Sequence, residues 1–238
     1  ALLLVKSGIK KPIIIIGFYD CKDEHKMYSL AKAGVIFAVY RNDQIKLLNK
    51  VGERAGTKIC VHLKVDCGTA RIGILPTDTL EIVKKITAQK YLQLEGLWSH
   101  FASSESDEIY TKKQHEAFQK TVSDIELVGI KIPIKHMACS ASTVLFPLNQ
   151  YNAARVGIST YGLHPSPNTE SKINLKPALS WHTRIIQVKT LPKGSKISYG
   201  GTYIAKSTIK LVVLPVGYYD GYDRGMSNTA QVIIKGKL

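Results

Sequence analysis

Short apolar runs alternate with amphipathic stretches through most of the chain. The run Ile13–Ile16, which proline and glycine bound, is typical of a strand that is buried on both faces. Comparable runs lie at 35–40, 59–66, 92–101, 134–139 and 153–160. Between the runs, apolar residues recur at helical spacing, as Leu47, Leu48 and Val51 do. About six strand–helix alternations of this kind predict an α/β fold with a parallel sheet, either a barrel or a doubly wound sheet.

Two helix starts can be predicted from the residues that precede the apolar stripes. Pro76 and Asp78 are residue types that favour the first turn of a helix. Thr111 and Gln114 have the spacing of a capping box. We therefore expect the helix that carries Phe118 to begin at Thr111.

The helical spacing stops after His164. Segments rich in β-branched residues follow, separated by glycine, proline and asparagine, at 181–191, 196–204, 208–218 and 230–238. We expect two domains, a barrel domain at 1–165 and a β-rich domain at 170–238.

The chain is strongly basic, with 33 Lys and Arg against 18 Asp and Glu and a formal net charge of +15. Such a balance can indicate a nucleic-acid-binding protein. The lysines, however, occur singly or in pairs such as Lys84–Lys85, without clusters that are interleaved with aromatic residues. A solvated lysine-rich surface explains the charge as well, and we do not expect nucleic acid as a partner.

The four cysteines indicate a reducing compartment. They have no CxxC pair and no regular spacing, so neither a metal site nor a disulfide framework is expected; they are Cys21, Cys60, Cys67 and Cys139. The sequence contains no apolar run of the ~20 residues that cross a bilayer. We expect a cytoplasmic protein that has no membrane partner.

Polar residues that could take part in catalysis or binding lie at or just after the ends of the predicted strands. They are Lys64, Arg71, His100, His136, Ser140 and Arg155. In a barrel of parallel strands, the carboxyl ends of the strands meet at one rim, where active sites form. These residues are therefore candidates for a common site.

Ser140 and Gly157 predict an anion site at that rim. A hydroxyl and free N–H groups at a helix start can hold a phosphate, and glycine lets the backbone approach it closely. Arg155 points to the same side as Gly157 if the segment is extended, and it can only donate hydrogen bonds. The alternatives are structural: Ser140 as a helix cap, Gly157 as a packing residue and Arg155 as an ion-pair partner.

Five sequence blocks together resemble alanine racemase, a pyridoxal-phosphate enzyme that joins a (β/α)8 barrel to a β-rich C-terminal domain. The blocks are VHLKVDCGTARIG at 61–73, LEGLWSHFASSE at 94–105, KHMACSAS with NAARVGISTYGL at 135–163, ISYGGTYIA at 197–205 and LPVGYYDGYDRGMSN at 214–228. The resemblance implies a partial barrel of about six of the eight strands.

The resemblance also implies roles for residues around the cofactor. Ser140 and the backbone N–H groups of Gly157 and Ile158 would hold the phosphate. Arg155 would face the pyridine nitrogen, with His136 hydrogen-bonded to it. An unprotonated pyridine is a weak electron sink, which would limit side reactions.

Three further roles follow from the resemblance on the barrel side. His100 would pack beside the cofactor ring. Arg71 would bind the phenolic oxygen of the cofactor and the carboxylate of the substrate. Lys64 matches a lysine that carries a carbamate in members of the family and steadies this arginine, although an ordinary lysine remains the alternative.

Two tyrosines of the β-rich domain complete the implied site. Tyr199 matches the second catalytic base, which takes the proton on the L face of Cα and comes from the partner subunit. A homodimer is therefore expected. Tyr218 would line the substrate entry or contact the active site across the dimer. Without the resemblance, a tyrosine beside Gly200 is more often a turn residue.

The sequence also departs from the family. The Schiff-base lysine of the family lies in a first-strand motif of the form VVKANAYGHG, which this sequence lacks. We therefore expect an internal fragment, truncated at both ends and inactive as written. Cys139 stands where asparagine is usual, and Cys67 and Thr69 replace residues of the usual TGM motif, which raises the chance of an altered substrate preference.

The expected function concerns the whole protein. It is the interconversion of L- and D-alanine with pyridoxal phosphate, which supplies D-alanine for peptidoglycan. The alternatives are a broader racemase of small amino acids such as serine, and a non-catalytic homologue that binds pyridoxal phosphate.

Overall fold

The computed structural model describes residues 1–147 and 151–238. It divides into two compact units, Ala1–Ala178 and Leu179–Leu238, and each is described by itself. The candidate residues around Arg155 all belong to the first unit.

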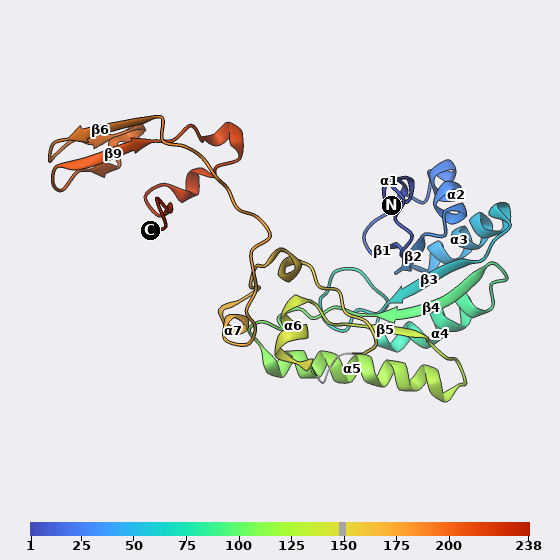
Figure 1. Cartoon of the computed structure of the whole chain (residues 1–238). Coiled ribbons are helices and arrows are strands. Elements are labelled where there is room, and N and C mark those ends of the chain that lie inside the picture. Colours follow the sequence, from blue (N-terminus) through green and yellow to red (C-terminus); the bar gives the residue numbers. More distant parts are fainter. Residues whose placement is uncertain (148–150) are drawn as a thin grey trace. The chain divides into compact units, whose positions relative to one another are not determined.

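A five-stranded parallel sheet forms the centre of the first unit (Figure 1). Its strands are β1 (Ile14–Ile15), β2 (Ile36–Val39), β3 (Ile59–Lys64), β4 (Leu92–Trp98) and β5 (Ile134–His136). Their order in the sheet is the order of the sequence. Each predicted run up to residue 139 therefore contains a strand, although every strand is shorter than its predicted run.

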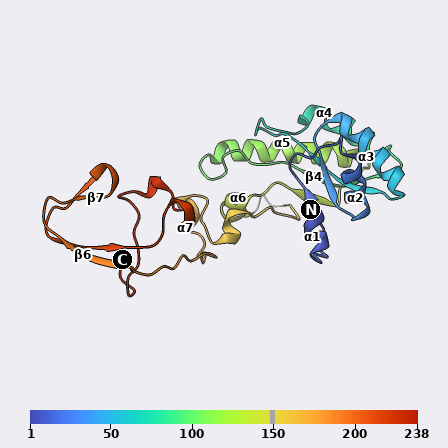
Figure 2. The same ribbon diagram turned by 90° about the horizontal axis from the view of Figure 1, so that it is seen from above.

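Helices connect successive strands. They are α2 (Glu24–Lys32), α3 (Asn42–Ala55), α4 (Pro76–Thr87) and α5 (Glu108–Leu127), and α1 (Leu2–Lys6) precedes β1. Because connections between parallel neighbours are right-handed, consecutive crossovers leave their helices on one face of the sheet. Figures 1 and 2 show α5 running alongside the sheet.

The apolar core fills the space between the sheet and these helices. Its fully buried side chains include Phe37, Leu63, Ile86, Leu97, Phe118 and Ile125. They come from β2, β3 and β4 and from the inner faces of α4 and α5. The rigid sheet positions the loops that follow the strands.

The predicted strand at 153–160 is wrong. Only an isolated bridge joins Ala153 to His136, and residues Ile158–Tyr161 form a 3-10 helix, η2. Val156 and Ile158 are 41% and 45% exposed, so the apolar pattern of this segment does not mark a buried strand.

The predicted capping box at Thr111 is also wrong. Helix α5 begins at Glu108, one turn earlier, and the Asp107 carboxylate accepts the N–H of Tyr110. Gln114 instead accepts the backbone N–H of Ala102 at 2.9 Å and so ties α5 to the loop after β4.

The second unit contains two antiparallel pairs. Strands β6 (Gln187–Leu191) and β9 (Ile209–Val213) form one pair, and β7 (Lys196–Ile197) and β8 (Tyr203–Ile204) form the other. The segment 230–238, predicted as a strand, has only a bridge between Ile234 and Lys237.

Two short helices, α6 (Ser140–Leu145) and α7 (Pro167–Glu170), lie in the first unit. The 3-10 helices η3 (Tyr199–Gly201), η4 (Tyr218–Asp220) and η5 (Arg224–Met226) lie in the second. None of the helices in the described residues is long and apolar enough to span a membrane.

Candidate active site

Arg155 is the best-anchored side chain at the rim of the sheet. Its Nη1 donates to Nδ1 of His136 at 2.6 Å. Its Nη2 lies 2.9 Å from Nδ1 of His100, and the same nitrogen donates to the carbonyl oxygens of Ser99 at 2.7 Å and Met137 at 3.3 Å. Within the described residues these contacts leave the Nε–H group as the donor without a partner.

The strands explain this anchoring. The backbone N–H of Arg155 donates to the carbonyl of Ala138, which follows β5 in the chain. This hydrogen bond brings the Arg155 side chain to the ends of β4 and β5. His100 and His136 come from the ends of those two strands. The structure thus brings together three residues that the sequence predicted to share a site.

Burial and the positive charges set the ionisation of this cluster. Burial lowers the pKa of Arg155 to about 10, which leaves it a cation at neutral pH. Burial, the Arg155 charge and His62 lower the pKa of His136 to about 3. Burial, followed by the charges of Arg155, Arg71 and Lys64, lowers the pKa of His100 to about 4. Both rings are therefore neutral and can act as acceptors.

Trp98 packs against two cationic side chains. Nζ of Lys64 lies 4.8 Å from the ring centre and the guanidinium carbon of Arg155 lies 4.7 Å from it. The ring also stacks on His136, at 5.6 Å between centroids and an interplanar angle of 4°. An indole is the aromatic ring that attracts cations most strongly, so Trp98 helps to hold both groups.

Lys64 is fully buried, and its amine has no hydrogen-bond partner in the described part of the chain. Burial, with the nearby charge of Arg71, lowers its pKa to about 8. A substantial share of this amine is therefore neutral and nucleophilic in weakly basic solution.

Ser140 and Gly157 meet, as predicted for the anion end of the site. The Oγ atom of Ser140 accepts the backbone N–H of Gly157 at 3.0 Å. That N–H group is therefore already paired, whereas the hydroxyl proton of Ser140 remains available to an anion. A Cβ added at Gly157 would meet nothing within 4 Å, so the space beside this backbone is open.

Cys139 precedes α6 and lies beside this anion end. Its Sγ atom is 3.3 Å from Oγ of Ser104. Burial acts to raise the pKa of the thiol, but hydrogen bonds from Ser104, Ser142 and backbone N–H groups outweigh it and place the pKa below its usual value. Cys139 therefore has polar partners within the chain at this position.

Arg71 lies in a loop that one carboxylate organises. Oδ1 of Asp66 accepts the backbone N–H groups of Gly68, Thr69 and Ala70, and Oδ2 accepts that of Arg71 at 2.9 Å. Burial raises the pKa of Asp66, but these hydrogen bonds outweigh it and lower the pKa overall. The side chain of Arg71 is exposed and forms no ion pair within the described residues.

A hollow of about 390 Å³ opens beside Arg71. It is lined by Phe18, Tyr40, Arg41, Arg71, Ile72 and Gly73. The two guanidinium groups make it a place where a carboxylate could bind.

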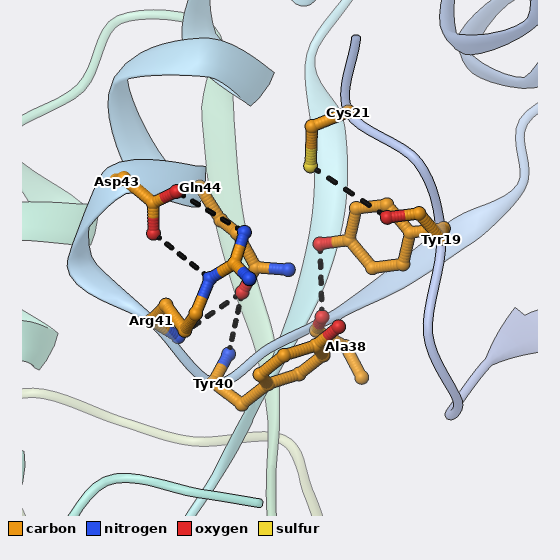
Figure 3. Close-up of polar contacts among 7 residues, drawn as sticks. All are labelled: Tyr19, Cys21, Ala38, Tyr40, Arg41, Asp43 and Gln44. Carbon is orange, nitrogen blue, oxygen red and sulfur yellow. Dashed lines mark hydrogen bonds and ion pairs between the residues drawn. The ribbon is translucent and has the colours of Figure 1, made fainter. Parts of the chain in front are cut away.

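Figure 3 shows how the Arg41 side of this hollow is built. Oε1 of Gln44 accepts the backbone N–H groups of Tyr40 and Arg41 at 2.9 and 3.0 Å, which fixes the turn from β2 into α3. The Arg41 guanidinium forms an exposed ion pair with Asp43 at 3.0 Å. Of the two arginines in the hollow, Arg41 is paired with a carboxylate, whereas the guanidinium of Arg71 is not paired with one among the residues that the structure describes.

Two family models match the chain. The model for the N-terminal domain of alanine racemase matches residues 1–165, and the model for the C-terminal domain of alanine racemase matches residues 178–238. The chain belongs to the alanine racemase family.

Curated alanine racemases match nearly the whole chain. The enzyme of Halothermothrix orenii is 37% identical over 235 residues, which is 98% of this chain and 61% of the relative. Alanine racemase 2 of Bacillus subtilis is 35% identical over 243 residues, which is 99% of this chain and 61% of the relative. The chain spans about three-fifths of the length of these relatives.

Solved alanine racemase structures share the fold. That from Clostridium difficile 630 has a TM-score of 0.85 and 29% identity, with coverage of 99% of this chain and 61% of that chain. That from Bacillus anthracis, with bound L-Ala-P, has a TM-score of 0.77 and 31% identity, with coverage of 93% and 57%. The predicted fold class, a partial α/β barrel and a β-rich domain, is confirmed, with five strands in the partial barrel rather than six.

Three residues that contact the Arg155 cluster or Lys64 were missed from the sequence. They are His62, Glu95 and Trp98. His62 and Trp98 sit inside apolar strand runs, where alternation alone marks them as core. Glu95 joins them only through the pairing of β3 with β4, which no local pattern reveals.

The two predicted tyrosines lie in the second unit. Tyr199 is 99% exposed at the tip between β7 and β8, and Tyr218 is 68% exposed in η4. Positive φ angles at Ser198, Gly200 and Gly201 form the tight turn that projects the Tyr199 side chain.

Proposed function

We propose that the whole protein is a pyridoxal-phosphate-dependent alanine racemase that interconverts L- and D-alanine. The observation that supports this most is the Arg155 cluster, in which two neutral histidines hold a guanidinium that is a cation at neutral pH and has its Nε–H group left over. It lies at the strand ends of an alanine racemase fold.

The residues present fit this cofactor. The Ser140 hydroxyl and the open backbone at Gly157 suit a phosphate, with the N–H of Ile158 as a further donor. The free Nε–H group of Arg155 suits a pyridine nitrogen. His100 lies next to Arg155, where its imidazole would pack beside the cofactor ring. Bound pyridoxal phosphate supplies an electron sink that acidifies the Cα–H bond of an amino acid.

Arg155 sets the character of that sink. Because a guanidinium only donates hydrogen bonds, a ring nitrogen facing it stays an unprotonated acceptor. A weaker sink favours return of the proton to Cα over competing reactions. The Arg155 cluster therefore matches racemisation better than other amino-acid chemistry.

Arg71 and Tyr199 would act on the substrate. The planar fork of Arg71 suits the substrate carboxylate and the phenolic oxygen of the cofactor. Inversion at Cα needs bases on both faces, and Tyr199 would take the proton from the L face. We propose that it comes from the partner subunit of a homodimer, with Tyr218 near the substrate entry. The product D-alanine would serve peptidoglycan synthesis in the cytoplasm.

Racemisation of L-alanine by the whole protein with added pyridoxal phosphate tests this proposal. We expect L-alanine to be converted at least tenfold faster than L-serine, and Arg71→Lys to raise the KM for alanine. Glu81→Gln, which changes an exposed ion pair on α4, is the matched control and should behave as wild type. Faster conversion of serine would favour the broader racemase. Cofactor binding without racemisation of either would contradict the proposal.

A further inference from the structure

A row of buried polar groups leads from Arg155 through the sheet. Nη1 of Arg155 lies 2.6 Å from Nδ1 of His136, Nε2 of His136 lies 2.9 Å from Nδ1 of His62, and Nε2 of His62 lies 3.2 Å from Oε2 of Glu95. The two histidines are 3% and 0% exposed. The row joins side chains of β5, β3 and β4, and its two ends, Arg155 and Glu95, are partly exposed.

Both ends of this row favour the same order of protons, because the Arg155 guanidinium can only donate and the Glu95 carboxylate can only accept. Arg155 can only donate, so Nδ1 of His136 accepts and the proton of this neutral ring lies on Nε2. That proton faces Nδ1 of His62, which must therefore accept as well. The proton of His62 then lies on its Nε2 and points at the Glu95 carboxylate.

Cationic forms of the rings do not fit this row. A proton added to Nδ1 of His62 would meet the Nε2–H of His136 across 2.9 Å, so the contact would break. Burial lowers the pKa of His62 as well as that of His136, in agreement with two neutral rings.

The strands are shaped to allow these contacts. The pairing of β3 with β4 shifts register between Val61 and His62, so Glu95 is an extra residue in β4. This shift lets Glu95 reach the His62 ring while Gly96 lies against it. A Cβ added at Gly96 would overlap that ring, and glycine is therefore needed there.

We propose that His62 and Glu95 are positioning residues that hold His136 in its Nε2–H form, so that its Nδ1 orients the Arg155 guanidinium toward the cofactor ring. The effect on the reaction rests on the proposed function, whereas the order of protons does not depend on the cofactor. Glu95 supplies the acceptor that ends the row and so keeps the proton of His62 on Nε2. Nδ1 of His62 is then an acceptor for the Nε2–H group of His136.

The proton order can be measured directly by NMR of the whole protein with ¹⁵N-labelled histidine, with and without pyridoxal phosphate. We expect His62 and His136 to carry their protons on Nε2 from pH 6 to 8. In Glu95→Gln, whose amide can also donate, we expect His62 to become a mixture of tautomers. A proton on Nδ1 of His136 in the wild type, or unchanged tautomers in Glu95→Gln, would overturn the proposal.

Kinetics separate positioning from simple stability. Glu95→Gln should lower kcat about tenfold, with little change in KM. The same change should have almost no effect on kcat in an Arg155→Lys background, because the row then no longer ends in a guanidinium. Additive effects of the two substitutions would contradict the proposal, and Glu81→Gln is the control.

The two proposals fail in different ways. An inert wild-type protein would refute the proposed function, and the NMR measurement on the same protein would still decide the proton order. An active wild type whose Glu95→Gln variant has normal tautomers and kcat would refute only the roles of His62 and Glu95.

Discussion

Arg155 owes its properties to its neighbours. Three carbonyl oxygens and two neutral imidazoles hold its Nη groups, and the guanidinium carbon lies 4.7 Å from the centre of the Trp98 ring. Lysine could not make this set of contacts, because an ammonium lacks the planar fork. The neutral histidines supply acceptors for the Arg155 guanidinium, and keeping them neutral lowers the free energy of unfolding in acid.

We predict that acid destabilises the protein through His100 and His136. Their pKa values are lowered to about 4 and about 3, whereas an unfolded histidine titrates near pH 6.5. The unfolded chain thus binds more protons below pH 6.5, so the free energy of unfolding falls as the pH drops. Each histidine contributes up to about 1.4 kcal/mol per pH unit.

Urea denaturation at pH 7.5 and pH 5 measures this effect. The decrease in the free energy of unfolding from pH 7.5 to pH 5 should be smaller in His100→Asn than in the wild type. His25→Asn, which changes an exposed histidine of α2, should leave the loss unchanged. Equal losses in His100→Asn and wild type would contradict the prediction.

Lys64 is predicted to form a carbamate. Its neutral amine would attack CO₂ to form an N–C bond and release one proton, and the new carboxylate would face the uncompensated charge of Arg71. ¹³C NMR of the whole protein under ¹³CO₂ at pH 8 should show one carbamate signal that is lost in Lys64→Arg. Lys84→Arg, an exposed control on α4, should retain the signal. A wild-type spectrum without the signal would rule the modification out.

Strands β3 and β4 carry the side chains that pack behind Arg155 and His136. Lys64 and Trp98 are register partners at the ends of these strands, and His62 faces Gly96 two residues earlier. The register shift near Glu95 brings its carboxylate to the His62 ring. It also makes the packing at Gly96 sensitive to any added atom.

We predict that Gly96→Ala destabilises the protein by about 1–3 kcal/mol, because the new Cβ would force the His62 ring out of place. Gly17→Ala is the matched control, since its added Cβ meets nothing within 4 Å and its φ is not positive. It should change the free energy of unfolding by less than about 0.5 kcal/mol. Equal stability of the two variants by urea denaturation would show that the ring moves freely.

The sequence predicted the positions of β2, β3 and β4 because each is rich in apolar residues and lies between amphipathic helical segments. It failed at 153–160, where Val156 and Ile158 are apolar but exposed and the chain turns at Gly157. The candidate residues at strand ends could be listed, since parallel strands end at one rim. The row through His62 could not, because it depends on register between strands.

At the scale of the whole molecule, the proposed site needs residues from two units. Arg155 belongs to the first and the exposed Tyr199 to the second. If Tyr199 completes the site of a partner subunit, two different inactive chains can complement each other.

Mixed dimers test this sharing. Tyr199→Phe and Arg155→Ala should each lose most activity alone. Random mixing of the two chains gives hybrids in half of the dimers, each with one intact site, and should restore about a quarter of wild-type activity. Mixtures no more active than the separate variants would place both residues in the site of one subunit.

Racemisation of L-alanine in D₂O by the whole protein tests whether separate bases act on the two faces of Cα. We expect D-alanine to carry deuterium at Cα from the earliest times, while the remaining L-alanine keeps its hydrogen, because one base removes the proton and another delivers it. D-alanine that retains the original hydrogen would mean that a single base moves the proton, and would contradict the proposed two-base mechanism.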